Sequence, residues 1–398
     1  MKKFLQYFFH RDHLIITASA FGQLLILGLI TFNIDFLNPI ATALENYSIT
    51  DLFFDIQHTG TDPDSCGLVT LVDMTDLHDR RDIAALLEEL DSYEPLYMGV
   101  DLLFEGEKDD ANANEAINNA VIGLNSQSVF SSKLVDYNST QKTFTSSVRS
   151  FFANKIKINE AYTNLNDDLT NSRIRNFSIS QMLNGERLLS FPAAIANAFD
   201  NTISDIDNNE ILINYKNVCF PVVAYDELYE NRDLIEGHIV LVGTMTEEQD
   251  MHNTPLGKMP GLEVQAYSLL TLLEHKEIKE APKWLIWVLA VFICYLLEVT
   301  IDVLSRIVNK HNKSVSMVFL KESNLVSLVM LFLWMVVVCW LMFLLFVKHG
   351  IVISGGLILG LMALVCEGRD LYKAIIKALG ARGRESRFIG TSLLKEKE

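Results

Sequence analysis

Residues 237–273, GHIVLVGTMTEEQDMHNTPLGKMPGLEVQAYSLLTLL, are the stretch that decides the fold. Its first part, residues 238–242, is apolar and β-branched and ends at Gly243, which is typical of a strand covered on both faces. Pro260 suits the first turn of a helix, and apolar residues then recur at helical spacing. We therefore predict a buried strand, a loop and a helix that leads toward a membrane segment beginning near Trp284.

Two more apolar strands are predicted upstream, at residues 68–73 and 96–102, with a helix at 79–90 between them. A strand, a helix and a second strand at this spacing imply a right-handed parallel unit. Other helices are predicted at residues 38–57, 112–124 and 191–199, and other strands at 128–134, 156–161, 211–215 and 218–223. The predicted fold class is an α/β domain with a mainly parallel sheet.

Polar side chains follow three of these strands. Asp73 and Asp101 end the two upstream strands, while Asp250, His252 and Thr254 come after the strand that ends at Gly243. Ligands collect at the carboxyl ends of parallel strands, so these five residues are candidate ligand-binding residues. The alternative is that each carboxylate caps a helix or ties a loop to backbone amides.

This arrangement resembles the end of the CHASE2 domain, an extracytoplasmic sensor module of bacterial receptors. In that family a GKIVLVG-like strand precedes an Asp, a Thr-Pro pair and a Pro-Gly-Val-Glu helix. The matching positions are residues 237–243, Asp250, Thr254, Pro255, Pro260, Gly261 and Glu263, and weaker matches extend over residues 45–275. The family often has a His in the last helix where this chain has Gln265, and a Trp-Pro-rich turn is missing between Met74 and Asp79.

The resemblance implies a sensory role, often with a cyclase, diguanylate cyclase or kinase after the third C-terminal span. Because 32 residues follow Cys366, we expect the signal to pass to a separate partner protein. One alternative is a structural or scaffolding subunit of a cell-envelope complex. Another is a periplasmic enzyme that uses Asp73, Asp101 and Asp250. The usual nucleotide, hydrolase and protease motifs are absent from residues 33–283, so we expect no catalytic residue, no enzyme activity and no cofactor.

Four transmembrane helices are predicted, one N-terminal and three C-terminal, at residues 14–32, 284–301, 325–346 and 351–366. Residues 14–32 are interpreted as an uncleaved anchor rather than a signal peptide, because too few apolar residues precede Ala18-Ser19-Ala20. Residues 1–13, the loop 302–324 and the tail 367–398 are predicted to be cytoplasmic, since basic residues favour that side. The predicted location is the bacterial cytoplasmic (inner) membrane, with residues 33–283 in the periplasm.

Charge divides the chain in the same way. Residues 33–283 hold 41 acidic and 17 basic side chains, whereas the remainder holds 9 acidic and 16 basic ones. This balance argues against nucleic-acid binding and favours an exported domain attached to a lipid bilayer. Residues 371–379 form an amphipathic stretch that would lie on the inner leaflet or dock onto a partner protein.

Three further sites are candidates. Cys66 and Cys219 lie in the exported domain and are a candidate disulfide, whereas no Cys/His spacing suggests zinc. Gly356 and Gly360 form a GxxxG pattern that would admit another helix, in this chain or in an oligomer. Glu298 is an intramembrane acid and hence a functional candidate, with snorkelling to the interface as the alternative.

Overall fold

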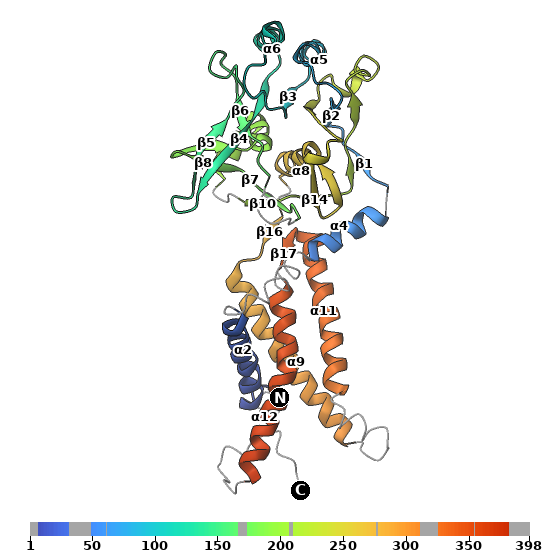
Figure 1. Ribbon diagram of the computed structural model, residues 1–398. Helices are drawn as coiled ribbons and strands as arrows, with labels where there is room; N and C mark the ends of the chain where they lie inside the picture. The colour runs from blue at the N-terminus through green and yellow to red at the C-terminus, as the bar shows by residue number, and fades with distance from the viewer. Residues whose placement is uncertain are drawn as a thin grey trace. The chain divides into compact units, whose positions relative to one another are not determined.

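The computed structural model (Figure 1) describes residues 7–31, 49–60, 62–165, 173–206, 210–275, 278–310, 325–353 and 355–381. The chain forms two compact units. We call Thr50–Lys279 the sheet unit, and Met1–Ile49 together with Glu280–Glu398 the helical unit.

The main sheet of the sheet unit has nine strands in the order β12-β2-β13-β3-β4-β5-β8-β9, and β6 also pairs with β4. Parallel pairing joins β12 (Val222–Ala224), β2 (Val69–Asp73), β13 (Ile239–Gly243), β3 (Tyr97–Val100), β4 (Ser128–Asn138) and β6 (Glu160–Tyr162), and it also joins β5 to β8. Antiparallel pairing joins β4 to β5 (Thr143–Val148), and β8 (Ser180–Leu183) to β9 (Glu186–Leu189). The prediction of an α/β domain with a mainly parallel sheet is confirmed.

Among the described residues of the sheet unit, three short strand pairs lie outside the main sheet. They are β1 (Asp64–Ser65) with β11 (Val218–Cys219), β7 (Asn176–Ser178) with β10 (Glu210–Leu212), and β14 (Met251–Thr254) with β15 (Gly257–Pro260). The last pair is an antiparallel hairpin within the loop that the sequence places between strand and helix. This loop is therefore ordered, and its hairpin brings the chain back to the start of the next helix.

Helices cover both faces of the parallel strands (Figure 1). Helices α5 (Arg80–Ser92) and α6 (Ala111–Gly123) share one core with alternate strand residues such as Val72 and Val240. On the other face lie α7 (Phe191–Phe199) and α8 (Gly261–Leu273). A Cβ at Gly99 of β3 would lie 2.8 Å from both Leu241 and Phe191, so only glycine lets α7 pack this closely.

The first helix of the sheet unit, α4, spans Ile49–Gly60. It corresponds to the end of the helix predicted at residues 38–57, whose first part lies outside the described residues. Short 3₁₀ turns occur at η2 (Ile203–Asp205), η3 (Arg232–Leu234) and η4 (Glu248–Asp250). Only η4 bears on the candidate site, because it ends at Asp250.

The helical unit contains the helices α2 (Arg11–Thr31), α9 (Lys283–Lys310), α11 (Leu325–His349) and α12 (Gly355–Ala381) and the short strand β17 (Ile351–Val352). The short strand β16 (Lys279–Glu280) includes the last residue of the sheet unit and the first of this part of the helical unit. Among the described helices, two are long and apolar enough to cross a membrane: α9 over Lys283–Val308, and α11. Helix α12 is continuous, so the span predicted at 351–366 and the amphipathic stretch at 371–379 belong largely to one helix. Likewise α9 continues beyond residue 301 into the predicted cytoplasmic loop.

Candidate functional site

A polar pocket lies at the carboxyl edge of the parallel strands. Asp101 directly follows β3, and its backbone N–H donates to the carbonyl of Val242 on β13 at 2.8 Å. The cavity beside it has a volume of about 140 Å³. It is lined by Asp101, Lys133, Thr163, Asn164, Leu165, Asp250, His252, Gly261 and Gln265. The structure thus brings together three of the five candidate residues, Asp101, Asp250 and His252.

The electrostatics of this pocket are dominated by its two carboxylates. Burial, together with the nearby charge of Asp250, raises the pKa of Asp101 to about 7, while His252 acts in the opposite direction. The imidazole Nε2 of His252 lies 3.4 Å from Asp250 Oδ1. Asp101 therefore exchanges its proton near neutral pH, and its charge responds to anything positive that enters the cavity.

Asp250 is held against the start of α8. A Cβ at Gly261 would lie 2.7 Å from Asp250 Oδ1, so this position must lack a side chain for the carboxylate to sit there. Negative charge is favourable at the N-terminus of a helix. The glycine at the start of α8 thereby leaves room for the Asp250 carboxylate at the pocket.

The other two candidates have structural roles elsewhere. Asp73 accepts hydrogen bonds from Thr75 N at 2.9 Å and Thr75 Oγ1 at 2.5 Å, which closes a turn after β2. Thr254 is 1% exposed, and its hydroxyl donates to Gly257 O at 2.8 Å across the turn of the β14–β15 hairpin. Neither side chain lines the pocket, so for these two positions the structure shows the loop-tying role.

The sequence did not single out most of the remaining pocket wall. Gln265 is 3% exposed, lines the cavity, and donates from Nε2 to Thr163 O at 3.1 Å. Asn164 clasps the backbone of Leu134, accepting from its N–H at 2.7 Å and donating to its carbonyl at 2.9 Å. The only signal for these residues was at Gln265, where the resembling family often has a histidine.

No group of three His, Cys, Asp or Glu side chains that could hold a metal ion occurs among the described residues. The pocket lining holds four titratable side chains, those of Asp101, Lys133, Asp250 and His252, which can exchange protons and form hydrogen bonds with a ligand.

The two cysteines of the sheet unit are free, so the candidate disulfide is not formed in this structure. Strands β1 and β11 do bring them close, and Cys66 N donates to Cys219 O at 2.8 Å. The register pairs Cys219 with Ser65, however. Since successive side chains of a strand point to opposite faces, Cys66 and Cys219 leave the ladder on opposite sides.

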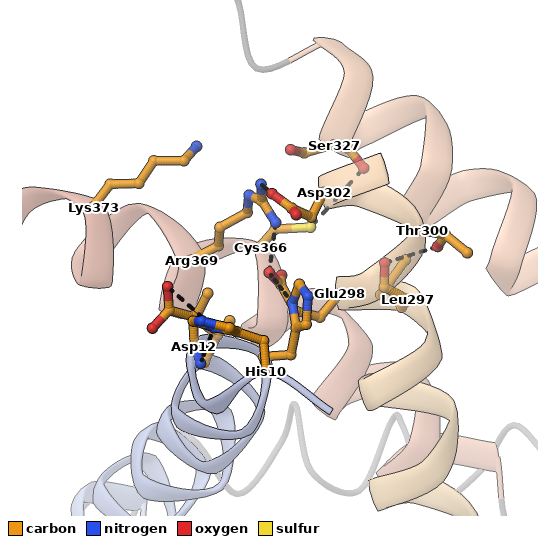
Figure 2. A network of polar contacts seen from close by, with 12 residues as sticks. His10, Asp12, Leu297, Glu298, Thr300, Asp302, Ser327, Cys366, Arg369 and Lys373 are labelled. Carbon is orange, nitrogen blue, oxygen red and sulfur yellow. Dashed lines mark hydrogen bonds and ion pairs between the residues drawn. The ribbon is translucent and has the colours of Figure 1, made fainter. Parts of the chain in front are cut away.

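Glu298 does not snorkel. It is 0% exposed in the helical unit, and its Oε1 accepts from Arg369 Nη1 of α12 at 2.5 Å (Figure 2). Asp302, one turn further along α9, binds the same guanidinium through Nη2 at 3.0 Å. Both acids lie on one face of α9 because they are four residues apart. The acid singled out by the sequence is therefore part of an ion-pair network between helices.

Further polar groups of α2 and its N-terminal side surround this network. His13 Nδ1 lies 3.5 Å from Glu298 Oε1, and the Tyr7 hydroxyl donates to Asp302 Oδ2. Asp12, labelled in Figure 2, accepts from the hydroxyl of Tyr372 on α12 at 2.9 Å. The buried charges therefore connect α2, α9 and α12.

The GxxxG pattern plays no part in packing within the described chain. Gly356 and Gly360 are exposed, and a Cβ built on either would meet nothing within 4 Å. The close approach occurs instead at Gly368, where a Cβ would clash with the hydroxyl of Ser19 on α2. Gly368, the residue before Arg369, therefore lies against α2.

These features define a protein with an α/β domain, a polar pocket at its sheet edge and apolar helices of membrane length. The family model of the CHASE2 domain matches residues 24–338. The chain belongs to the CHASE2 family, whose domains are extracytoplasmic sensors. No curated protein and no solved structure matches the chain.

Proposed function

We propose that this protein is a multi-pass membrane sensor whose CHASE2 domain binds its signal in the pocket around Asp101 and relays it to a separate partner protein. The observation that carries the proposal is the convergence of Asp101, Asp250 and His252 on one cavity at the carboxyl edge of a parallel sheet. Ligands of open α/β sheets bind at this edge. A group with a pKa near 7, such as Asp101, changes charge in response to small changes around it.

The proposed topology has four spans, α2, α9, α11 and α12, in the bacterial inner membrane. The charge distribution supports it, because the acidic residues concentrate in 33–283 and the flanking segments are basic. In this arrangement the sheet unit is periplasmic, and both chain ends are cytoplasmic.

The proposed relay runs through α12. This helix is 27 residues long, and Leu371 and Ile375 near its end are 51% and 45% exposed. Lys373 and Lys377 flank these apolar side chains. An apolar stripe between basic residues gives a partner protein, or the inner leaflet, a surface on which to dock.

The test is to purify tagged full-length protein from its native membranes in mild detergent and to identify what accompanies it by mass spectrometry. We expect a signalling protein such as a kinase, cyclase or regulator. The same purification is repeated with Asp101→Asn and with the matched control Asp109→Asn, since Asp109 is an exposed acid outside the pocket. Recovery of the partner, or its modification state, should change in Asp101→Asn only.

The contrary result would be that only cell-envelope proteins co-purify, in a fixed ratio that is the same for wild type and for both variants. That outcome would refute the sensor and support a structural or scaffolding subunit.

A further inference from the structure

Arg369 occupies an unusual position for a charged side chain. It is 2% exposed, and its guanidinium bridges Glu298 and Asp302, which are 0% and 3% exposed. Figure 2 shows this guanidinium between the two acids of α9. A planar guanidinium holds two carboxylates in a fixed geometry, which a lysine ammonium cannot reproduce. The angular position of α12 about its own axis is therefore tied to α9.

The network is incompletely satisfied. Among the described residues, Glu298 Oε2, Arg369 Nε and both ring nitrogens of His13 have no hydrogen-bond partner. Buried polar networks are most stable when every member is paired. Beside the two contacts of Arg369, His13 Nδ1 lies 3.5 Å from Glu298 Oε1 and Arg306 pairs with Asp302, so the network leaves hydrogen-bonding capacity unused.

A second contact, between Cys366 of α12 and Ser327 of α11, involves the same face of α12. Cys366 lies three residues before Arg369, so the two side chains share one side of the helix. Its Sγ lies 4.0 Å from the backbone carbonyl of Ser327 on α11 (Figure 2). A rotation that unseats Arg369 also moves Cys366 away from Ser327.

We propose that Arg369 is a latch: its ion pairs with Glu298 and Asp302 set the rotation of α12 against α9, and their opening turns α12. The inference rests on the proposed function, in which α12 leads from the membrane to the docking surface at Leu371 and Ile375. It adds the specific contact that must break for the relay to operate. A switch requires two arrangements of different free energy, and the proposed second one is that in which Arg369 has left the two acids.

The test uses disulfide formation in the full-length protein in lipid nanodiscs. Ser327→Cys is introduced beside the native Cys366, and Cys66, Cys219, Cys294 and Cys339 are replaced, so that one pair remains. The rate of oxidation by copper phenanthroline is then compared in this background and in Arg369→Gln. The control is Lys373→Gln, since Lys373 is on the same helix and its partner is the exposed Asp370.

We expect Arg369→Gln to slow disulfide formation by about tenfold or more, because removing one member of a buried pair leaves uncompensated charge. Glu298→Gln/Arg369→Gln should recover part of the rate, since it removes the orphaned Glu298 carboxylate, and Lys373→Gln should leave the rate unchanged. Should Arg369→Gln fail to fold, Arg369→Lys retains the charge but not the bridge, and an intermediate rate is expected.

An unchanged rate in folded Arg369→Gln, or in Arg369→Lys where the first does not fold, would overturn the latch. This experiment needs neither signal nor partner. A failure to recover a signalling protein would therefore reject the relay while leaving the latch intact, and an unchanged disulfide rate would reject the latch alone.

Discussion

Replacing Asp101 by Asn should remove the part of the sheet unit's pH-dependent stability that comes from this carboxyl group. In the folded protein the pKa of Asp101 is about 7, against an ordinary value of 3.8. Between these two values the folded state binds a proton that the unfolded chain has lost, so the free energy of unfolding falls as pH rises. The loss begins near pH 4 and is complete above about pH 7. Asn cannot ionise, so Asp101→Asn removes this contribution.

The size of the effect follows from the same two values. At 1.36 kcal/mol for each pH unit, the gap corresponds to an upper limit of ~4 kcal/mol. Local rearrangement and water in the cavity reduce this, and we expect ~2 kcal/mol at about pH 8. Wild type and variant should converge below about pH 3, where Asp101 is protonated in both the folded and the unfolded state.

Hydrogen exchange of full-length protein in nanodiscs measures this difference. Amides of β3 and β13 should exchange ~30-fold more slowly in Asp101→Asn than in wild type at about pH 8. Comparison at equal pH cancels the intrinsic pH dependence of exchange, and the exposed Asp109→Asn serves as the control. Equal protection of wild type and Asp101→Asn at this pH would refute the reasoning, as would a difference between them that does not grow from about pH 4 to about pH 8.

Three further substitutions test neighbouring steps. Because His252 lowers the pKa of Asp101, His252→Gln should move the loss of protection to higher pH, and an unmoved exchange profile would contradict this coupling. Thr254→Val should reduce the local stability of the β14–β15 hairpin by ~1 kcal/mol, measured by hydrogen exchange of the β14 amides. It should leave the pH dependence of protection in β3 and β13 unchanged. A changed pH dependence would assign Thr254 to the pocket. Gly368→Ala should destabilise the helical unit by ~1–3 kcal/mol, while Gly356→Ala should have no effect on its stability. Thermal unfolding followed by tryptophan fluorescence measures both variants. Equal effects would show that α12 does not pack as described.

The regular core of the sheet unit could be predicted from the sequence because local patterns decide it. Apolar β-branched runs gave β2, β3 and β13 within one or two residues, and helical spacing gave α5, α7 and α8. A strand buried on both faces has few alternatives once its neighbours are parallel. The position of Asp101 at the carboxyl edge follows from this core.

The sequence could not predict which of the candidate acids lines the pocket and which only ties a loop. Asp73 and Asp101 both end parallel strands, and what distinguishes them is the next few residues. Asp73 is followed by Thr75, whose amide and hydroxyl bind the carboxylate, whereas nothing comparable follows Asp101. Lys133 and Asn164 reach the pocket from β4 and from beyond β6, and only the strand order brings them there.

The helical unit shows the same limit across longer separations. Glu298 and Arg369 are 71 residues apart, and each lies in a stretch that hydropathy alone assigns to a membrane or to its border. Hydropathy indicates whether a helix is apolar enough to lie in a lipid bilayer, but it does not indicate the direction in which a single charged side chain points. The continuity of α12 places Arg369 at the level of Glu298, and this continuity was missed because residues 351–366 and 371–379 gave two separate patterns.

The structure explains the consequence of having glutamine rather than the family's frequent histidine at position 265. The resembling family often has a histidine there, which in this pocket would add a second imidazole able to carry positive charge toward the two carboxylates. An amide cannot be protonated at physiological pH, and this one is committed to Thr163 O. His252 is thus the one imidazole in the pocket lining that opposes the raised pKa of Asp101. A positively charged second histidine would lower that pKa further and keep Asp101 ionised at neutral pH. The amide therefore helps to place the protonation change of Asp101 within the neutral range, where binding of a proton or a cationic group alters the charge of the sheet edge most strongly.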